Sequence, residues 1–163
     1  EHFSGKDLPF NLVLGATVQE EVGLRGAQTI STIIKPDIFI ALDSSPINDL
    51  LEPHNLGKMG SGAMIRIFDP GIMLPLKVKH YFVDVATRYK VNHQFYSSKG
   101  NTDASRVLLA NEGVLSTAIV LPTRYIHSNA ALFEINDLLA VRDLVKAIIT
   151  DLDEDKVNHL IYK

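Results

Sequence analysis

Residues 12–18 (LVLGATV) lead, after one glutamine, into Glu20 and Glu21, and residues 38–42 (IFIAL) lead directly into Asp43. Both runs are apolar and too short for ordinary helices, which favours strands buried on both faces of a sheet. A helical pattern separates them, so we expect a βαβ unit with two parallel strands. Because parallel strands end at the same edge of a sheet, the carboxylates should meet at that edge.

The rest of the chain continues this alternation of strands and helices. Further strands are predicted at residues 63–68, 93–96 and 116–121. Helices are predicted at residues 23–34, 76–89, about 102–111, where Thr102 or Asp103 could cap the helix, and about 136–152. Residues 47–61 contain proline and several glycines and are predicted to form a long loop. The pattern predicts a single three-layer α/β/α domain over residues 1–163, with helices on both faces of the sheet.

Composition excludes several classes of protein. The 163 residues are 46% hydrophobic, which suffices for one domain with a core. A net charge of -3 gives no basic field for a nucleic-acid backbone, so no nucleic-acid partner is expected. No segment approaches the roughly 18 uninterrupted apolar residues of a membrane span, and the first residues lack the order of a signal peptide. We expect a soluble, cytoplasmic protein without a membrane partner.

The adjacent carboxylates of Glu20 and Glu21 disfavour each other's charge, so they require open water or a cation. Asp43 and His127 each follow a predicted strand and could join them at the sheet edge. The chain has no cysteine, so a metal here must use His, Asp and Glu, and one glutamate could act as base toward a metal-bound water. The same residues also suit a solvated loop, a turn or cap aspartate and a hydrogen-bonded structural histidine. Residue types alone leave this choice open.

Four segments add a resemblance to a known family. They are ATVQEEVGLRGA at residues 16–27, IALD at 40–43, GNTDA at 100–104 and RYIHS at 124–128. They resemble, in the same order, motifs of the dinuclear metallo-aminopeptidases that include glutamyl aminopeptidase and the tetrahedral aminopeptidases. Residues 94–100 look closest to the glutamyl branch. The resemblance implies a zinc-peptidase-like α/β/α sheet.

The resemblance also implies a set of roles. Glu20 would be the general base, Glu21 and His127 would share one metal ion, and Asp43 would hold the other. The cofactors would be two divalent ions, zinc or cobalt. The implied reaction is removal of the N-terminal residue of a peptide, with an acidic residue preferred, through a metal-activated hydroxide whose proton Glu20 carries to the leaving amine.

Three further residues are candidates for the surroundings of this site. Lys99 and Arg124 could pair with a carboxylate of the substrate. Arg124 could instead pair with a structural carboxylate. Asp103 could be a residue behind the metal ligands or only a helix N-cap.

The chain departs from the family pattern before residue 19. The family's early histidine ligand, its bridging aspartate and its oligomerisation domain all precede the Glu-Glu motif, and His2 lies in no matching motif. We therefore expect the C-terminal portion of a catalytic domain, truncated at the N-terminus. Alone it should bind metal weakly or not at all and be inactive. Unprotected sheet edges would favour a homo-oligomer.

Two other functions stay open. One is a non-catalytic truncated chain that binds a peptide or a partner without cleaving it. The other is a different amide hydrolase on the same scaffold, because a fold does not fix a substrate.

Overall fold

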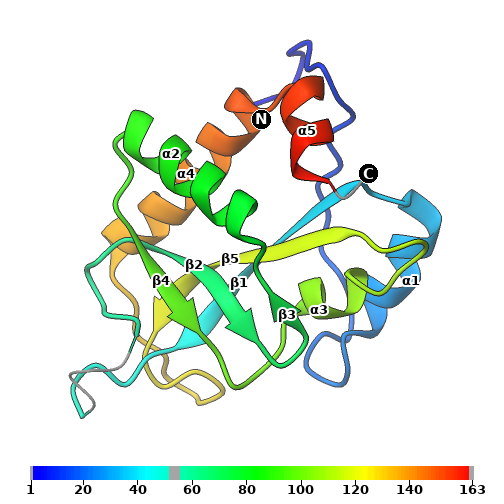
Figure 1. Ribbon diagram of the computed structural model, residues 1–163. Helices are drawn as coiled ribbons and strands as arrows, with labels where there is room; N and C mark the ends of the chain where they lie inside the picture. Colours follow the sequence, from blue (N-terminus) through cyan, green and yellow to red (C-terminus); the bar gives the residue numbers. More distant parts are fainter. Residues whose placement is uncertain (1, 52–55, 162–163) are drawn as a thin grey trace.

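The computed structural model describes residues 2–51 and 56–161 and shows a mixed sheet with helices on both faces (Figure 1). The strands within these residues are β1 (Ile38–Pro46), β2 (Ala63–Asp69), β3 (Ile72–Met73), β4 (His93–Ser97) and β5 (Leu115–Thr123). The helices are α1 (Arg25–Ile34), α2 (Leu76–Arg88), α3 (Asp103–Val107), α4 (Ile135–Asp151) and α5 (Glu154–Leu160). None of the described helices combines the length and the apolar character needed to cross a bilayer.

The sheet is organised by the pairing of β1 with β5. These two strands run parallel over nine residue pairs, from Ile38 opposite Leu115 to Pro46 opposite Thr123. On its other side β5 pairs antiparallel with β2, which in turn pairs parallel with β4 and antiparallel with β3. The second edge of β1 has no strand partner among the described residues.

Two layers of helices cover the sheet, as the alternation of elements predicts. Helices α2, α4 and α5 lie together across the top of Figure 1, and α1 lies beside α3 at the lower right. The core under the first group includes Ile65, Phe82, Val85, Ile119, Leu144 and Ile148. The core under α3 includes Ala41, Met64, Ala104, Ala118 and Val120. The three-layer α/β/α architecture is therefore confirmed.

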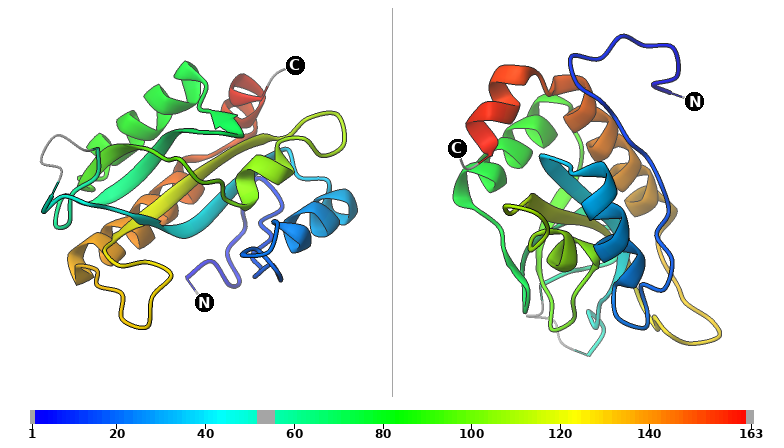
Figure 2. Two further views of the ribbon diagram at one scale, coloured as in Figure 1. Left: turned by 90° about the horizontal axis from the view of Figure 1, so that it is seen from below. Right: turned by 90° about the vertical axis from the view of Figure 1, so that its right-hand side faces the viewer.

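The predicted strand at residues 12–18 is wrong. Residues 2–24 form turns and extended coil along the outside of the molecule (Figure 2, right). Val13, Leu14 and Val18 are 59%, 72% and 69% exposed. A continuous apolar run becomes a strand only where a neighbouring strand supplies hydrogen bonds. Within the described residues no strand lies beside this segment, so the predicted parallel pairing with residues 38–42 is absent and β5 takes that place.

Other boundaries differ in smaller ways. Asp43 does not follow β1 but lies inside it, opposite Val120. Pro122 does not end β5. The pairing of β5 with β2 involves only Ile119 and Val120, so Pro122, which has no N–H, lies beyond it and breaks no hydrogen bond to β2. Helix α3 stops four residues before the predicted Asn111, and β3 and α5 are additional elements. The loop predicted at 47–61 is confirmed outside residues 52–55, which are not among the described residues.

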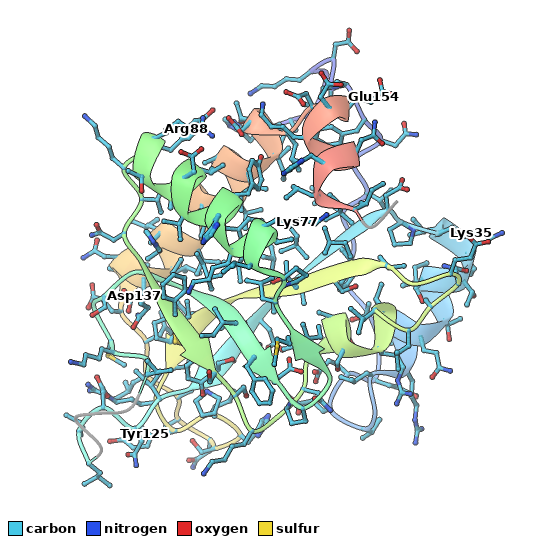
Figure 3. All side chains as sticks on the ribbon, in the orientation of Figure 1. Lys35, Lys77, Arg88, Tyr125, Asp137 and Glu154 are labelled. Carbon is cyan, nitrogen blue, oxygen red and sulfur yellow. The ribbon has the colours of Figure 1, made fainter. Side chains whose placement is uncertain are left out.

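A buried aspartate fixes the start of α4 against the loop before β2. Asp137, labelled in Figure 3, is only 1% exposed. Its carboxylate accepts hydrogen bonds of 2.7 Å from the backbone N–H groups of both Gly60 and Gly62. Gly62 has a φ of +93°, and a Cβ there would lie 2.2 Å from the Asn92 carbonyl oxygen. The close approach of the Gly60–Gly62 loop to α4 and to Asn92 therefore needs both Gly62 and the Asp137 carboxylate.

We expect Asp137→Ala to lower the free energy of unfolding by roughly 2–4 kcal/mol, because two charge-assisted hydrogen bonds are lost and two N–H groups are left without an acceptor. Urea unfolding followed by circular dichroism measures the change. Asp143→Ala is the matched control, since Asp143 lies on the same helix and its side chain is 45% exposed. The control should change stability by less than about 0.5 kcal/mol. Equal effects of the two substitutions would contradict this role of Asp137.

Candidate active site

Glu20 and Glu21 lie in a short loop that backbone hydrogen bonds close before α1 begins. The Glu20 carbonyl accepts from the N–H groups of Gly23 at 3.1 Å and Leu24 at 2.9 Å. The Gly26 N–H donates to the Val18 carbonyl at 2.9 Å. With this many internal bonds, the loop presents its two glutamates on a defined backbone.

The structure brings His127 to this loop from a distant part of the sequence. Its Nε2 atom lies 3.0 Å from a carboxylate oxygen of Glu21. The two side chains are 67% and 71% exposed, so the pair lies at the surface. His127 sits in the turn after β5 with a left-handed φ of +60°, as does the nearby Tyr125, which is labelled in Figure 3. The predicted association of Glu21 with His127 is thus present.

Glu20 and Asp43 share an environment that favours their protonated forms. Burial raises the pKa of Glu20, and the charges of Asp43, Asp103 and Glu21 raise it further. Burial also raises the pKa of Asp43, although the Ser44 N–H, 2.7 Å from the carboxylate, opposes this rise. Several carboxylates therefore repel one another at one place in the fold, and such a place attracts a cation.

Asp103 lies under this group of acids. It is 8% exposed and accepts a hydrogen bond from the Thr17 hydroxyl, while its other carboxylate oxygen is buried without a hydrogen-bond partner. The N-cap of α3 is Thr102. Of the two alternatives for Asp103, the N-cap is therefore excluded, and the residue instead contacts the segment that carries Glu20.

Arg124 and Lys99 differ in whether their side chains are available to bind a substrate carboxylate. The Arg124 guanidinium holds both carboxylate oxygens of Asp49, at 2.8 and 2.9 Å, and this pair lowers the pKa of Asp49. Arg124 thus adopts the structural pairing that was one of its two alternatives. The side chain of Lys99 is exposed to solvent.

Sequence reasoning missed two residues that shape this region. Arg66 is 5% exposed and bonds to Asp69 at 3.1 Å and to the Ser45 hydroxyl at 2.8 Å, and its charge opposes the raised pKa of Asp43. An arginine in the middle of the apolar run at 63–68 was a usable signal, because a buried charge needs a partner. Thr17 carries no comparable signal in the sequence.

Comparison with known proteins identifies the family. The family model described as M42 glutamyl aminopeptidase matches residues 1–144. The chain belongs to this family. It is 48% identical to the glutamyl aminopeptidase of Lactococcus lactis over 158 residues, which cover 96% of this chain and 44% of the relative. It is 31% identical to the lysyl aminopeptidase of Pyrococcus furiosus over 148 residues, which cover 87% of this chain and 41% of the relative.

The solved structures agree with this M42 assignment. The TET aminopeptidase of the marine sediment archaeon Thaumarchaeota archaeon SCGC AB-539-E09 matches with a TM-score of 0.85 and 35% identity, covering 89% of this chain and 42% of that one. The M42 fold is thus confirmed. The chain spans less than half the length of the relatives that it matches.

The donor types of this M42 chain suit a divalent ion, but the described donors do not complete a site. Glu21 offers a carboxylate oxygen and His127 an imidazole nitrogen, and the two atoms lie 3.0 Å apart. Both are ligand types that zinc accepts. Among residues 2–51 and 56–161, however, no three His, Asp or Glu side chains are grouped closely enough to hold an ion. The donors present therefore fit part of a metal site.

Gly26→Ala should disrupt the glutamate loop, because a Cβ at this position would lie 2.5 Å from the backbone nitrogen and oxygen of Val18. We expect a loss of roughly 1–3 kcal/mol in the free energy of unfolding. Gly15→Ala is the control, since its Cβ would meet no atom within 4 Å. Thermal melts of both variants provide the measurement. A Gly26→Ala variant as stable as Gly15→Ala would refute the close contact.

Glu20→Gln and Asp43→Asn should each increase stability near neutral pH. A raised pKa means that the folded state binds the proton more tightly than the unfolded state, so ionisation destabilises the fold as the pH rises above the ordinary values of 4.5 and 3.8. The gain should be present at about pH 7 and vanish below about pH 4. Urea unfolding across this range measures it, with the exposed Glu112→Gln as control. A gain that grows on acidification would contradict the assignment.

Proposed function

We propose that this chain carries the proton-transfer and part of the metal-binding machinery of a metal-dependent aminopeptidase. The observation that carries the proposal is the 3.0 Å contact of Glu21 with His127, beside two carboxylates, Glu20 and Asp43, with raised pKa values. Membership of the M42 family supports it. We assign Glu20 as the general base, Glu21 and His127 as ligands of one ion, and Asp43 as a ligand of a second.

The chemistry follows from the position of Glu20. A divalent ion, zinc or cobalt, would supply Lewis acidity that polarises the substrate carbonyl and acidifies water. Glu20 accepts the proton of the attacking water and passes it to the leaving amine. Its raised pKa brings its affinity for a proton closer to what transfer near neutral pH requires. Asp43 and Asp103 increase that affinity through their charge.

The substrate is a peptide, and we propose a preference for an acidic N-terminal residue. The 48% identity to a glutamyl aminopeptidase supports this preference more than the 31% identity to a lysyl aminopeptidase opposes it. Lys99 is exposed and free to meet a substrate carboxylate, whereas Arg124 is occupied by Asp49. Lys99 is therefore the better candidate for recognising the acidic side chain.

Self-association is the second part of the proposal. Within the described residues β1 has no strand partner on its second edge, and its own Leu42 is exposed, as are Val13 and Leu14. An open strand edge with apolar side chains beside it favours pairing with another chain. We propose a homo-oligomer on this basis.

Calorimetric titration with zinc or cobalt, together with a glutamyl-anilide hydrolysis assay, tests the metal site. The 163-residue chain should bind weakly and show no turnover, because the described residues offer at most two adjacent donors. His127→Ala should weaken binding at least about tenfold. His80→Ala, an exposed histidine on α2, should bind like the unaltered chain.

Two results would count against the proposal. Tight binding of two ions with turnover would refute the weak-site part of it. Equal affinities of the unaltered chain and His127→Ala would refute the ligand assignment, and would favour a non-catalytic chain that binds a peptide or partner.

A further inference from the structure

The hydrogen bond between Thr17 and Asp103 joins two parts of the chain that are 86 residues apart. Thr17 lies three residues before Glu20, in the coil that leads into the glutamate loop. Asp103 is the first residue of α3, and Ala104 and Val107 of the same helix are fully buried. The bond thus connects an exposed coil to a well-packed part of the core.

The loop is otherwise bonded mainly to itself and to α1. Its backbone hydrogen bonds run between residues 18–20 and residues 23–26. These bonds fix the shape of the loop, but they do not fix where the loop stands relative to β1 and β5. The end of the loop is anchored through α1, because the buried Ala27 packs with Val107 and Val114. The Thr17 hydroxyl anchors the beginning of the loop, through its hydrogen bond to Asp103.

The geometry around the bond leaves little freedom at Thr17. A Cβ on Gly26 would lie 3.2 Å from the Thr17 Cβ, so Gly26 packs directly against this threonine. On the other side, Asp103 is 8% exposed, and its charge contributes to the raised pKa of both Glu20 and Asp43. Thr17 is therefore held between the start of α1 and the carboxylate under the site.

We infer that Asp103, acting through the Thr17 hydroxyl, is the positioning residue that sets the glutamate loop at the correct place for Glu21 to meet His127. The inference rests on the proposed function for its purpose, because that function requires Glu21 and His127 at one point. It gives Asp103 a task different from ligand, base or substrate contact. It also makes Thr17 part of the site although its side chain touches none of the reacting groups.

The test uses the full 163-residue chain and two independent readouts. Nuclear Overhauser cross-peaks between the His127 ring and the Glu21 side chain report the geometry without metal. Titration with cobalt reports binding at the same place. Thr17→Val and Asp103→Ala remove the bond, whereas Thr17→Ser keeps the hydroxyl and Asp103→Asn keeps an acceptor oxygen. Thr32→Val is the matched control, because the Thr32 hydroxyl bonds only within α1.

We expect Thr17→Val and Asp103→Ala to lose the cross-peaks and to weaken cobalt binding about tenfold. Thr17→Ser, Asp103→Asn and Thr32→Val should retain both. A purely structural bond would lower the melting temperature without this selective loss and rescue.

Three results would overturn the inference. They are cross-peaks that persist in Thr17→Val, cross-peaks that are absent from the unaltered chain, and global unfolding of Thr17→Val, which would show that the bond holds the whole fold. Failure of the unaltered chain to bind cobalt would instead contradict the proposed metal site, and the cross-peaks would still decide the positioning role.

Discussion

The parallel pairing of β1 with β5 is the constraint on which the arrangement of the site depends. It sets Asp43 beside Val120 and brings the ends of both strands together at Pro46 and Thr123. The pairing continues past the sheet, because the Ile47 N–H donates to the Thr123 carbonyl at 3.0 Å. The ion pair of Asp49 with Arg124 extends it further. The two loops that leave these strands are thereby joined, and the turn with His127 follows directly from the second.

Charge balance decides how this site can act. Burial raises the pKa of Glu20 and of Asp43. The charge of Asp103 raises both pKa values further, and the charge of Asp43 also raises that of Glu20. Arg66 supplies a nearby positive charge, but it is bonded to Asp69 and only reduces the effect on Asp43. An excess of negative charge remains, and it can be relieved by a proton or by a metal ion. This accounts for both proposed properties, a base of raised pKa and an affinity for cations.

The sequence predicts those features that depend on local pattern. Helix α2 forms where residues 76–89 show an apolar face, and it buries Val78, Phe82 and Val85 there. The run at 12–18 has an equally clear apolar pattern, yet whether it forms a strand depends on a neighbour that the pattern does not contain. The Thr17–Asp103 bond is less predictable still, because one hydroxyl and one carboxylate leave no periodic signal. The meeting of Glu21 with His127 was predictable only by combining strand ends with motif resemblance.

The energetics of the Glu21–His127 pair show what holds it in place. Both side chains are about two-thirds exposed, and surface pairs of this kind contribute at most about 1 kcal/mol. The left-handed backbone conformation of Tyr125 and of His127 costs at least about 1 kcal/mol at each residue. The pair therefore does not offset the strain of its own turn. Two other interactions stabilise the strained turn. Arg124 and Leu132 exchange backbone N–H to carbonyl hydrogen bonds of 2.8 and 3.0 Å, and the Arg124 guanidinium donates to the Asp49 carboxylate. A turn whose conformation is imposed by its surroundings leaves its histidine available for a ligand, which is what a metal site requires.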